Sequence, residues 1–138
     1  MTYTIDQLKP GMSESLAHTV TGRDIELFGE VSGDTNPVHF DEAFARTTIF
    51  KGRIAHGILS ASYISTVLGM KMPGPGTIFM SLTTRFKAPV RIGDTVVTVC
   101  TVREVNAEKR RVVFDCLCKV KDTTVIEGEA MVMAPAAA

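Results

Sequence analysis

The segment that most constrains the fold lies near the middle of the chain. Residues 58–70, ILSASYISTVLGM, are apolar or small nearly all round, and the first charged side chain after them is Lys71. A helix on the surface of a globular domain shows a polar face, which this segment lacks. It is also shorter than the roughly 20 residues that cross a membrane. We therefore predict a helix that starts at His56-Gly57 and is enclosed by the rest of the domain.

The sequence after Gly76 predicts the β-strands that would enclose this helix. Val, Ile, Thr and Phe recur there, partly with period-two alternation, and Gly, Asn and Asp mark the turns. A weaker alternation at residues 12–20 predicts one earlier strand. An antiparallel sheet needs cover on its apolar face, so we predict an α+β domain in which the sheet wraps the helix. The four later strands are expected within residues 77–90, 94–105, 110–120 and 124–133.

Two shorter helices are expected before the central one. Thr21 and Asp24 have the spacing of a capping box, which predicts a helix from about residue 22 to 31. Asp41 begins the stretch DEAFARTT, where a carboxylate suits the free amides of a helix start. The 138 residues fit one domain, placed at 1–134, and the Ala-rich end at 135–138 is expected to be disordered.

The composition argues against several classes of partner. Lys and Arg number 15, and Asp and Glu also number 15, so no net field attracts nucleic acid or an anionic membrane. No charged start is followed by a long apolar run, so we expect a soluble, cytoplasmic protein that acts on a small molecule or another protein. Cys100, Cys116 and Cys118 have neither metal-binding nor disulfide spacing and are expected to be reduced and buried.

The polar stretch SGDTNPVHFDEA, residues 32–43, is the main candidate site. Asp34 and His39 are five positions apart, which on a straight helix sets them about 140° apart around the axis. Pro37 disfavours a helical Asn36, so the chain turns there and the carboxylate and imidazole can converge beside the Asn36 amide. The same residues make good turn chemistry without catalysis, and the spacing alone leaves both readings open.

Gly57, at the start of the predicted central helix, is the second candidate. The first amides of a helix are unpaired donors that stabilise developing negative charge, and glycine lets a substrate approach closely. A tight helix start with His56 as a cap explains the same residues, so both readings stay open. A metal site from Asp34, His39 and His56 lacks a recognised ligand spacing, and we predict none. His18 has no acidic neighbour in its strand and is expected to be structural or exposed.

Residues 28–45, FGEVSGDTNPVHFDEAFA, resemble the signature of the (R)-specific enoyl-CoA hydratases, the hydratase-2 or MaoC-like dehydratase family. Two later stretches, IAHGILSASYIS and FKAPVRIGDTV, are similar to the segment that leads into the family's central helix and to its strand-turn-strand. The likeness covers nearly the whole chain. The residues that carry the signature are Phe28, Ser32, Gly33, Asp34, Asn36, Pro37, Val38, His39 and Ala45.

This resemblance implies a hot-dog fold, in which a curved antiparallel sheet wraps one long helix. Family members of this length pair as homodimers and hold the acyl thioester in a tunnel at or near the interface. Their reaction is the reversible syn hydration of a trans-2-enoyl-CoA to an (R)-3-hydroxyacyl-CoA. It uses no metal or redox cofactor, and CoA is part of the substrate.

By the same resemblance, Asp34 and His39 are the catalytic pair and hold the water that adds to the substrate. Asn36 is expected to orient the pair or the water. The Gly57 amide is expected to polarise the thioester carbonyl, and Ser62, one turn into the helix, to face the tunnel. The CoA phosphates need cations near the tunnel mouth, for which the candidates are Arg53, Arg85 and Lys87.

Three other readings stay open on the sequence. Some hot-dog proteins are acyl-CoA thioesterases that carry a lone acid on or near the helix, but no Asp or Glu lies between Gly57 and Met70 here. A dehydratase acting on substrate bound to acyl carrier protein uses the same chemistry as a hydratase. A non-catalytic partner subunit would be marked by loss of Asp34 or His39, and both are present. Neither the acyl chain length nor the pathway follows from these residues.

Overall fold

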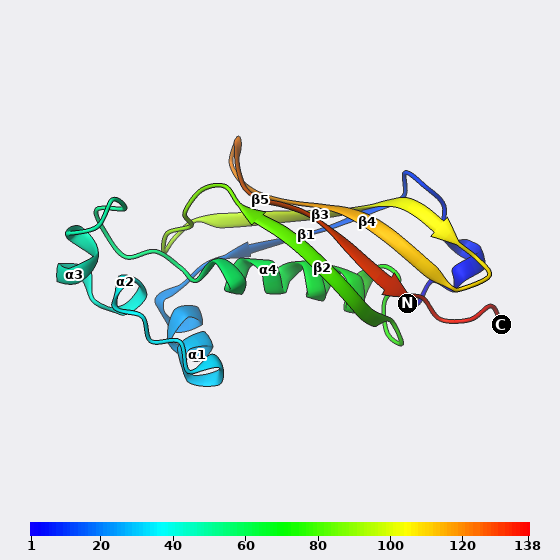
Figure 1. Cartoon of the computed structure of the whole chain (residues 1–138), viewed down its shortest axis with the longest axis horizontal. Coiled ribbons are helices and arrows are strands. Elements are labelled where there is room, and N and C mark those ends of the chain that lie inside the picture. The colour runs from blue at the N-terminus through cyan, green and yellow to red at the C-terminus, as the bar shows by residue number, and fades with distance from the viewer.

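The architecture, described for all of residues 1–138 by a computed structural model, is one curved antiparallel sheet folded over one long helix (Figure 1). All neighbouring strands pair antiparallel. The predicted α+β hot-dog arrangement is confirmed, including the single strand that precedes the helices. In sheet order, the strands are β1 (Ser13–Thr19), β3 (Thr95–Asn106), β4 (Arg111–Val120), β5 (Thr123–Met133) and β2 (Ile78–Phe86).

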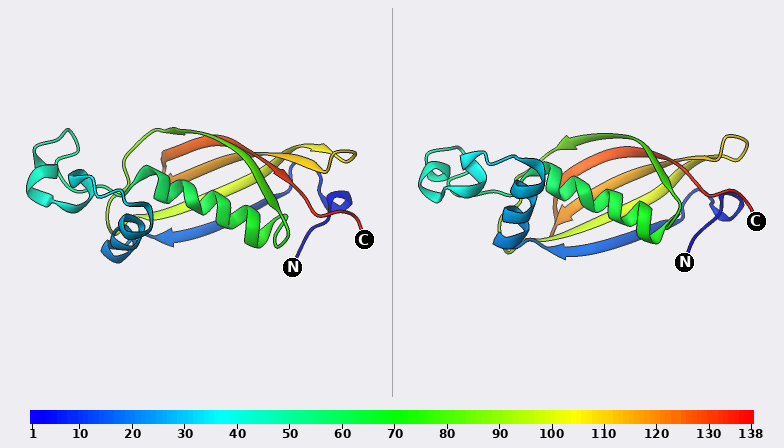
Figure 2. Two further views of the ribbon diagram at one scale, coloured as in Figure 1. Left: turned by 60° about the horizontal axis from the view of Figure 1, so that its bottom comes forward. Right: turned by 90° about the horizontal axis from the view of Figure 1, so that it is seen from below.

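The central helix crosses the concave side of the sheet (Figure 2). It consists of α4 (Gly57–Thr66) and continues into a π-helical segment, η2 (Val67–Lys71). The other helices gather at one end of the molecule, and both termini lie at the opposite end (Figure 1). These helices are α1 (Gly22–Ser32), α2 (Pro37–Phe40) and α3 (Glu42–Arg46), and a short 3-10 turn, η1 (Ile5–Gln7), lies near the N-terminus.

Local capping signals set the bounds of the helices at that end. The Thr21 hydroxyl accepts a hydrogen bond from the Asp24 N–H at 3.1 Å, and Asp24 Oδ2 accepts one from the Thr21 N–H at 2.9 Å. This is the predicted capping box, and α1 then ends at Gly33, whose φ of 76° lies in the left-handed region. Asp41 caps α3 by accepting a hydrogen bond from the Phe44 N–H at 3.1 Å. The chain therefore turns twice within a few residues of the candidate site.

The hydrophobic core lies between the sheet and the inner side of the central helix. Leu59, Ile64 and Val67 from the helix belong to one buried cluster with inward residues of the strands, such as Phe114 and Val132. Along β3 and β4 every second residue is buried over much of the strand, which confirms the predicted alternation.

The outer side of the central helix is uncovered in a single chain, so the prediction of full enclosure is wrong. Ile58 is 53% exposed and Met70 66%. The neighbouring edge strand β2 is similar, with Ile78 57% and Phe86 54% exposed. The five strands curl around only one side of the helix, so its other side stays open, with Ser62, Ser65 and Thr66 exposed between the apolar Ile58 and Met70.

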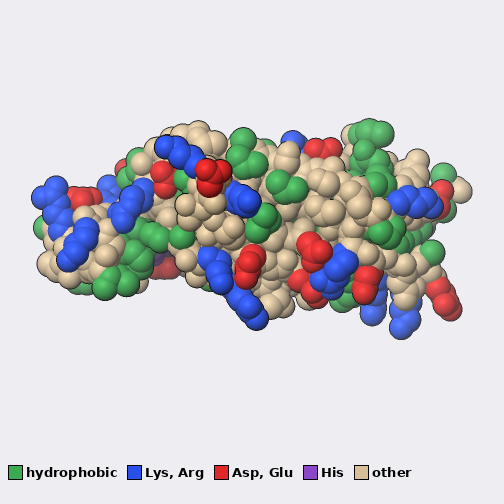
Figure 3. Space-filling view, turned by 90° about the horizontal axis from the view of Figure 1, so that it is seen from above, with side chains coloured by type: hydrophobic (Ala, Val, Ile, Leu, Met, Phe, Trp, Pro, Cys, Tyr) green, Lys and Arg blue, Asp and Glu red, His purple; other side chains and the backbone are tan.

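The outer face of the sheet carries charges of both signs (Figure 3). Arg103 contacts both Asp115 and Glu129 across the strands, each at 2.8 Å. Basic and acidic side chains are interspersed over this face, in keeping with a formal net charge of zero. None of the helices is long and apolar enough to cross a membrane.

Candidate active site

A turn between α1 and α2 positions the first candidate residues. Asp34 Oδ1 accepts a hydrogen bond from the Asn36 N–H, and Asn36 Oδ1 accepts one from the Val38 N–H, both at 3.2 Å. Asn36 has ψ 125°, as expected before a proline, and Pro37 is the first residue of α2. The predicted turn is therefore present, and it carries His39 back toward Asp34.

The ring of His39 is buried and held in one orientation. Its Nδ1 lies 2.8 Å from the Ile54 carbonyl oxygen. Because a carbonyl oxygen only accepts, Nδ1 carries the proton and Nε2 of the neutral ring carries the lone pair. Burial lowers the pKa of His39 below its usual 6.5, and the His56 ring also lowers it, while the Ile54 carbonyl and the Asp34 carboxylate act in the opposite direction. This ring is suited to accept a proton at Nε2 near neutral pH.

His56 lies directly against the His39 ring, a contact that the sequence did not reveal. The two ring centroids are 3.9 Å apart and the planes are 30° from parallel. His56 Nε2 donates a hydrogen bond to the backbone oxygen of Asp34 at 2.9 Å, and the residue is only 2% exposed. His56 occupies the N-cap position of α4 but its ring makes no capping hydrogen bond, so its interpretation as a cap is wrong. It belongs to the cluster of Asp34 and His39.

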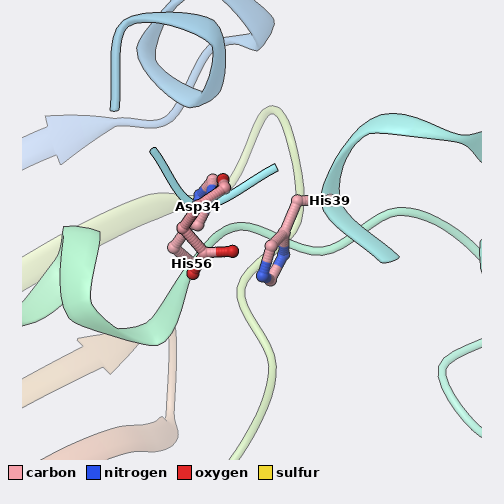
Figure 4. Close-up of side chains that lie close together, drawn as sticks. All are labelled: Asp34, His39 and His56. Carbon is pink, nitrogen blue, oxygen red and sulfur yellow. The ribbon is translucent and has the colours of Figure 1, made fainter. Parts of the chain in front are cut away.

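These three side chains converge from the turn, from α2 and from the start of α4 (Figure 4). One carboxylate oxygen of Asp34 and one ring nitrogen of each histidine lie within 4.8 Å of one another. A water that makes hydrogen bonds of about 2.8 Å can bridge two atoms up to about 5.6 Å apart, so one water can contact both Asp34 and His39. The same groups are also types that ligate divalent metals, and the absence of a metal stays a prediction.

The cluster lines a cavity of about 510 Å³. Small-molecule sites occupy roughly 300–1,000 Å³ and combine apolar walls with a few polar groups, and this cavity has that character. Its polar lining includes Asp34, His39, His56, Ser60 and Lys87. Its apolar lining includes Phe50, Ile54, Ile58, Phe86, Val90 and Ile126.

Gly57 lines the same cavity, next to the Phe86 ring. As the first residue of α4, it has an N–H with no acceptor inside the helix. A Cβ atom at this position would come within 2.7 Å of Phe86 Cδ1. Glycine therefore keeps a backbone donor accessible at a point where no larger residue fits beside the ring.

Two predicted substrate-binding residues lie outside the cavity lining. Ser62 is exposed, and its hydroxyl donates to the Leu59 carbonyl at 2.5 Å. The serine that lines the cavity is Ser60, which is 1% exposed and whose Oγ has no hydrogen-bond partner. Its spacing of three from Gly57, on the same side of the helix, was a signal that could have identified it. Asn36 is exposed and its side-chain oxygen caps α2 rather than reaching Asp34 or His39.

The candidate cations differ in their surroundings. The Arg53 guanidinium donates from Nε to the His39 backbone oxygen at 2.7 Å, so it supports α2. Lys87 lines the cavity and lies 3.7 Å from Glu127 Oε1. Arg85 lies in a separate polar groove with Asp115 and Glu127. Of the three, Lys87 is the one beside the cavity.

His18 lies away from this cavity, and its surroundings differ from the prediction in one respect. Its Nε2 lies 2.8 Å from Asp24 Oδ2, although no acid neighbours it in its strand. The acid that His18 contacts, Asp24, lies in α1, which the sequence analysis predicted as a separate helix. The histidine is structural, as predicted, and the pair joins β1 to the start of α1.

Comparison with known proteins supports this description. Residues 7–124 match the family described as MaoC like domain. The chain is 53% identical over 131 residues to an (R)-specific enoyl-CoA hydratase of Rhodospirillum rubrum, covering 95% of this chain and 91% of that protein. It is 45% identical to a 3-hydroxybutyryl-CoA dehydratase of Methylorubrum extorquens, covering 94% and 83%. Among solved structures, an unliganded R-hydratase from Pseudomonas aeruginosa superposes with a TM-score of 0.92 at 40% identity, covering 99% and 88%.

Proposed function

The chain belongs to the MaoC-like family, and we propose that it hydrates a trans-2-enoyl-CoA reversibly to an (R)-3-hydroxyacyl-CoA with a water held between Asp34 and His39. The observation that carries this proposal is the convergence of the Asp34 carboxylate and the His39 ring within 4.8 Å at the wall of one cavity. Hydration of an enoyl thioester needs a base for water and a proton for the α-carbon, and these two groups can serve both.

The reaction divides one water between two neighbouring carbons. His39 Nε2 accepts a proton from the water as its oxygen bonds to the β-carbon, because Nδ1 is committed to the Ile54 carbonyl. The π electrons of the double bond move toward the thioester carbonyl, and the proton taken up by His39 is returned through Asp34 to the α-carbon, so both side chains regain their starting states. Asp34 and His39 are close enough to contact the same water, so oxygen and proton reach one face of the double bond and addition is syn. The net change is the addition of one water.

The Gly57 N–H is proposed to stabilise the enolate that forms between these steps. It is a free donor at the N-terminus of α4, where the helix favours negative charge. Loss of one such donor typically costs about 3 kcal/mol of transition-state stabilisation. The carbonyl oxygen of the bound thioester would point at this N–H, which sets the β-carbon near the water.

We propose no metal or redox cofactor for this reaction. Hydration changes no net oxidation state, so no redox cofactor is needed, and the CoA group arrives as part of the substrate. Lys87, beside the cavity, is a candidate contact for the CoA phosphates.

A second copy of the chain is proposed to cover the open side of the cavity. The exposed apolar side chains of the central helix and those on the helix-facing side of β2 are grouped as one surface, the α4–β2 strip. Ile58 and Phe86 belong both to the strip and to the cavity lining, so a partner on the strip would close the cavity at its mouth. The exposed members of the strip are Ile58, Met70, Phe79, Leu82 and Phe86, and its β2 residues lie opposite the inward-facing Val132, Ala130 and Ile126 of β5.

The three thiols support a cytoplasmic location. Cys100 and Cys116 are directly opposite each other on β3 and β4, and both are free and buried. A hydrogen bond with Cys116, together with burial, raises the pKa of Cys100, which keeps it protonated and unreactive. Facing, unlinked cysteines are typical of proteins from reducing compartments.

The experiment that tests the function offers the purified protein trans-2-enoyl-CoA substrates of increasing chain length. Loss of the conjugated enoyl absorbance, with an (R)-configured product on chiral analysis, is expected. The same acyl chains on acyl carrier protein, assayed in parallel, decide the carrier. Release of free CoA without hydration would instead identify a thioesterase, a reading already disfavoured because α4 carries no acid.

A further inference from the structure

We propose that His56 is a positioning residue that holds His39 as a neutral base with its Nε2 aimed at the water, by stacking on its ring and by binding the backbone of Asp34. This inference rests on the proposed function for its catalytic meaning, but the contacts stand independently. His56 contacts both members of the proposed pair, with its ring face against the His39 ring and its Nε2 on the Asp34 backbone. Neither contact involves the substrate.

The hydrogen bonds fix opposite tautomers on the two stacked rings. His56 Nε2 faces a carbonyl oxygen and therefore carries the proton, whereas in His39 the protonated nitrogen is Nδ1. His56 Nδ1 is then left as a buried lone pair with no hydrogen-bond partner. With Nε2 bound to a carbonyl oxygen and Nδ1 facing no polar partner, His56 has no group with which to exchange a proton, and proton transfer is left to His39.

The surroundings of His56 are built to hold its ring in place. Phe28 and Phe40 pack against it with ring centroids at 4.8 Å and 5.6 Å. Phe40 fits only because residue 29 is glycine, since a Cβ at Gly29 would come within 2.5 Å of the Phe40 ring. Two aromatic rings and one glycine thus immobilise a histidine that the hydration chemistry itself does not use.

The charges around His39 come from several elements. Burial is the main cause that lowers the pKa of His39, and the His56 ring adds to it, while the Ile54 carbonyl and the Asp34 carboxylate act in the opposite direction. The Arg53 side chain donates from Nε to the His39 backbone oxygen. The Arg53 backbone N–H donates to Oε2 of Glu42. The titratable groups nearest the two rings are therefore Asp34, Glu42, Arg53 and Lys87, with only aromatic side chains contributed from the α1 side.

Two variants separate the two contacts. His56→Phe keeps a ring face against His39 and removes the donor to Asp34, whereas His56→Gln keeps a donor and removes the ring. His18→Phe is the matched control. Like His56, His18 contacts an aspartate, here the Asp24 carboxylate, and packs against a ring, that of Tyr63, with the centroids 4.8 Å apart. His18 lies outside the cavity lining. Each variant is assayed for kcat, KM and the pH profile of kcat/KM, and for the thermal unfolding midpoint.

Both His56 variants are expected to lower kcat by about 10- to 100-fold with KM changed by less than about threefold, because the base is misplaced while substrate contacts remain. The acid limb of kcat/KM should move to higher pH in both, since both lose the imidazole that disfavours the charged form of His39. A His56→Phe enzyme that unfolds at the normal temperature and keeps the wild-type kcat and pH profile would overturn the proposal.

Nitrogen NMR of the histidine rings in substrate-free protein distinguishes this proposal from the proposed function. The expected result is a single Nδ1–H tautomer for His39 that titrates below 6.5, with the titration midpoint rising in His56→Phe. That result supports the positioning role even if no enoyl-CoA is hydrated. A mixed His39 tautomer in the wild type, or an unchanged midpoint in the variant, contradicts it.

Discussion

The Phe86 ring of β2 lies so close to the backbone of Gly57 that a Cβ atom on Gly57 would come within 2.7 Å of Phe86 Cδ1. Both residues line the cavity, one at the first turn of α4 and the other at the end of an edge strand. The contact joins the proposed enolate-binding donor to the wall of the acyl site. A larger residue at position 57 would therefore reduce the space beside the Gly57 N–H.

Gly57→Ala is therefore expected to lower kcat/KM by about a hundredfold, because the Phe86 ring must shift and the thioester carbonyl loses its place at the N–H. The half-exposed ring can move, so folding should be retained. Gly69→Ala is the matched control, since a Cβ there meets nothing within 4 Å. It should keep full activity and raise stability by about 0.5–1 kcal/mol, as alanine does in a helix. Equal activity of the two variants would exclude a role for the Gly57 backbone.

Asp34→Asn and His39→Asn are each expected to reduce hydration by about 10²–10⁴-fold while the protein remains folded. Asparagine at 34 keeps the oxygen that accepts from the Asn36 N–H, and asparagine at 39 keeps a donor for the Ile54 carbonyl. The measurement is loss of enoyl absorbance, with circular dichroism as the folding control. Near-normal turnover in either variant would show that its side chain has no part in the chemistry.

The two serines of α4 give a matched pair. Ser60→Ala should lower kcat/KM by about threefold to tenfold, the size of one hydrogen bond, if its unpartnered Oγ binds substrate or water in the cavity. Ser62→Ala should leave activity unchanged, because that hydroxyl is committed to the Leu59 carbonyl. The opposite order of effects would place the tunnel on the exposed side of the helix.

The pH dependence follows from the buried base. The pKa of His39 is lowered below 6.5, chiefly by burial, so the folded protein binds a proton there less readily than the unfolded chain does. Activity should therefore persist below pH 6.5 and fall as the pH drops through the lowered pKa of the folded state. Stability should also decline as the pH falls from about 6.5, since the unfolded chain takes up the proton first. Rate profiles and urea midpoints measure both effects, and His39→Asn should flatten the stability change.

The α4–β2 strip provides the test of pairing. Leu82→Glu, on the exposed edge strand and opposite the inward-facing Ala130, should shift the protein toward monomers in sedimentation velocity and lower activity at dilute concentration, because a charge cannot be buried there without a partner. Val97→Glu is the control, since Val97 lies opposite Lys119 on the outer face of the sheet. If both variants sediment as the wild type does, the strip is not the dimer interface.

Much of the fold follows from features that depend only on neighbours along the chain. The charge-free segment 58–70, the period-two strands and the Thr21 capping box each indicate one element, and each is present. The turn at Asn36-Pro37 is also local, because proline restricts the residue before it whatever the rest of the molecule does. These features bring Asp34 and His39 into the same site.

The contacts that complete the site are of another kind. The stack of His56 on His39, the pair of His18 with Asp24 and the approach of Phe86 to Gly57 join segments that no local rule connects. The spacing of three between Gly57 and Ser60 was the one local signal for the serine that lines the cavity. A helix with no charged side chain and only hydroxyls on its open side marks its rotation weakly, and packing against the curved sheet decides which side meets the cavity and which is left open.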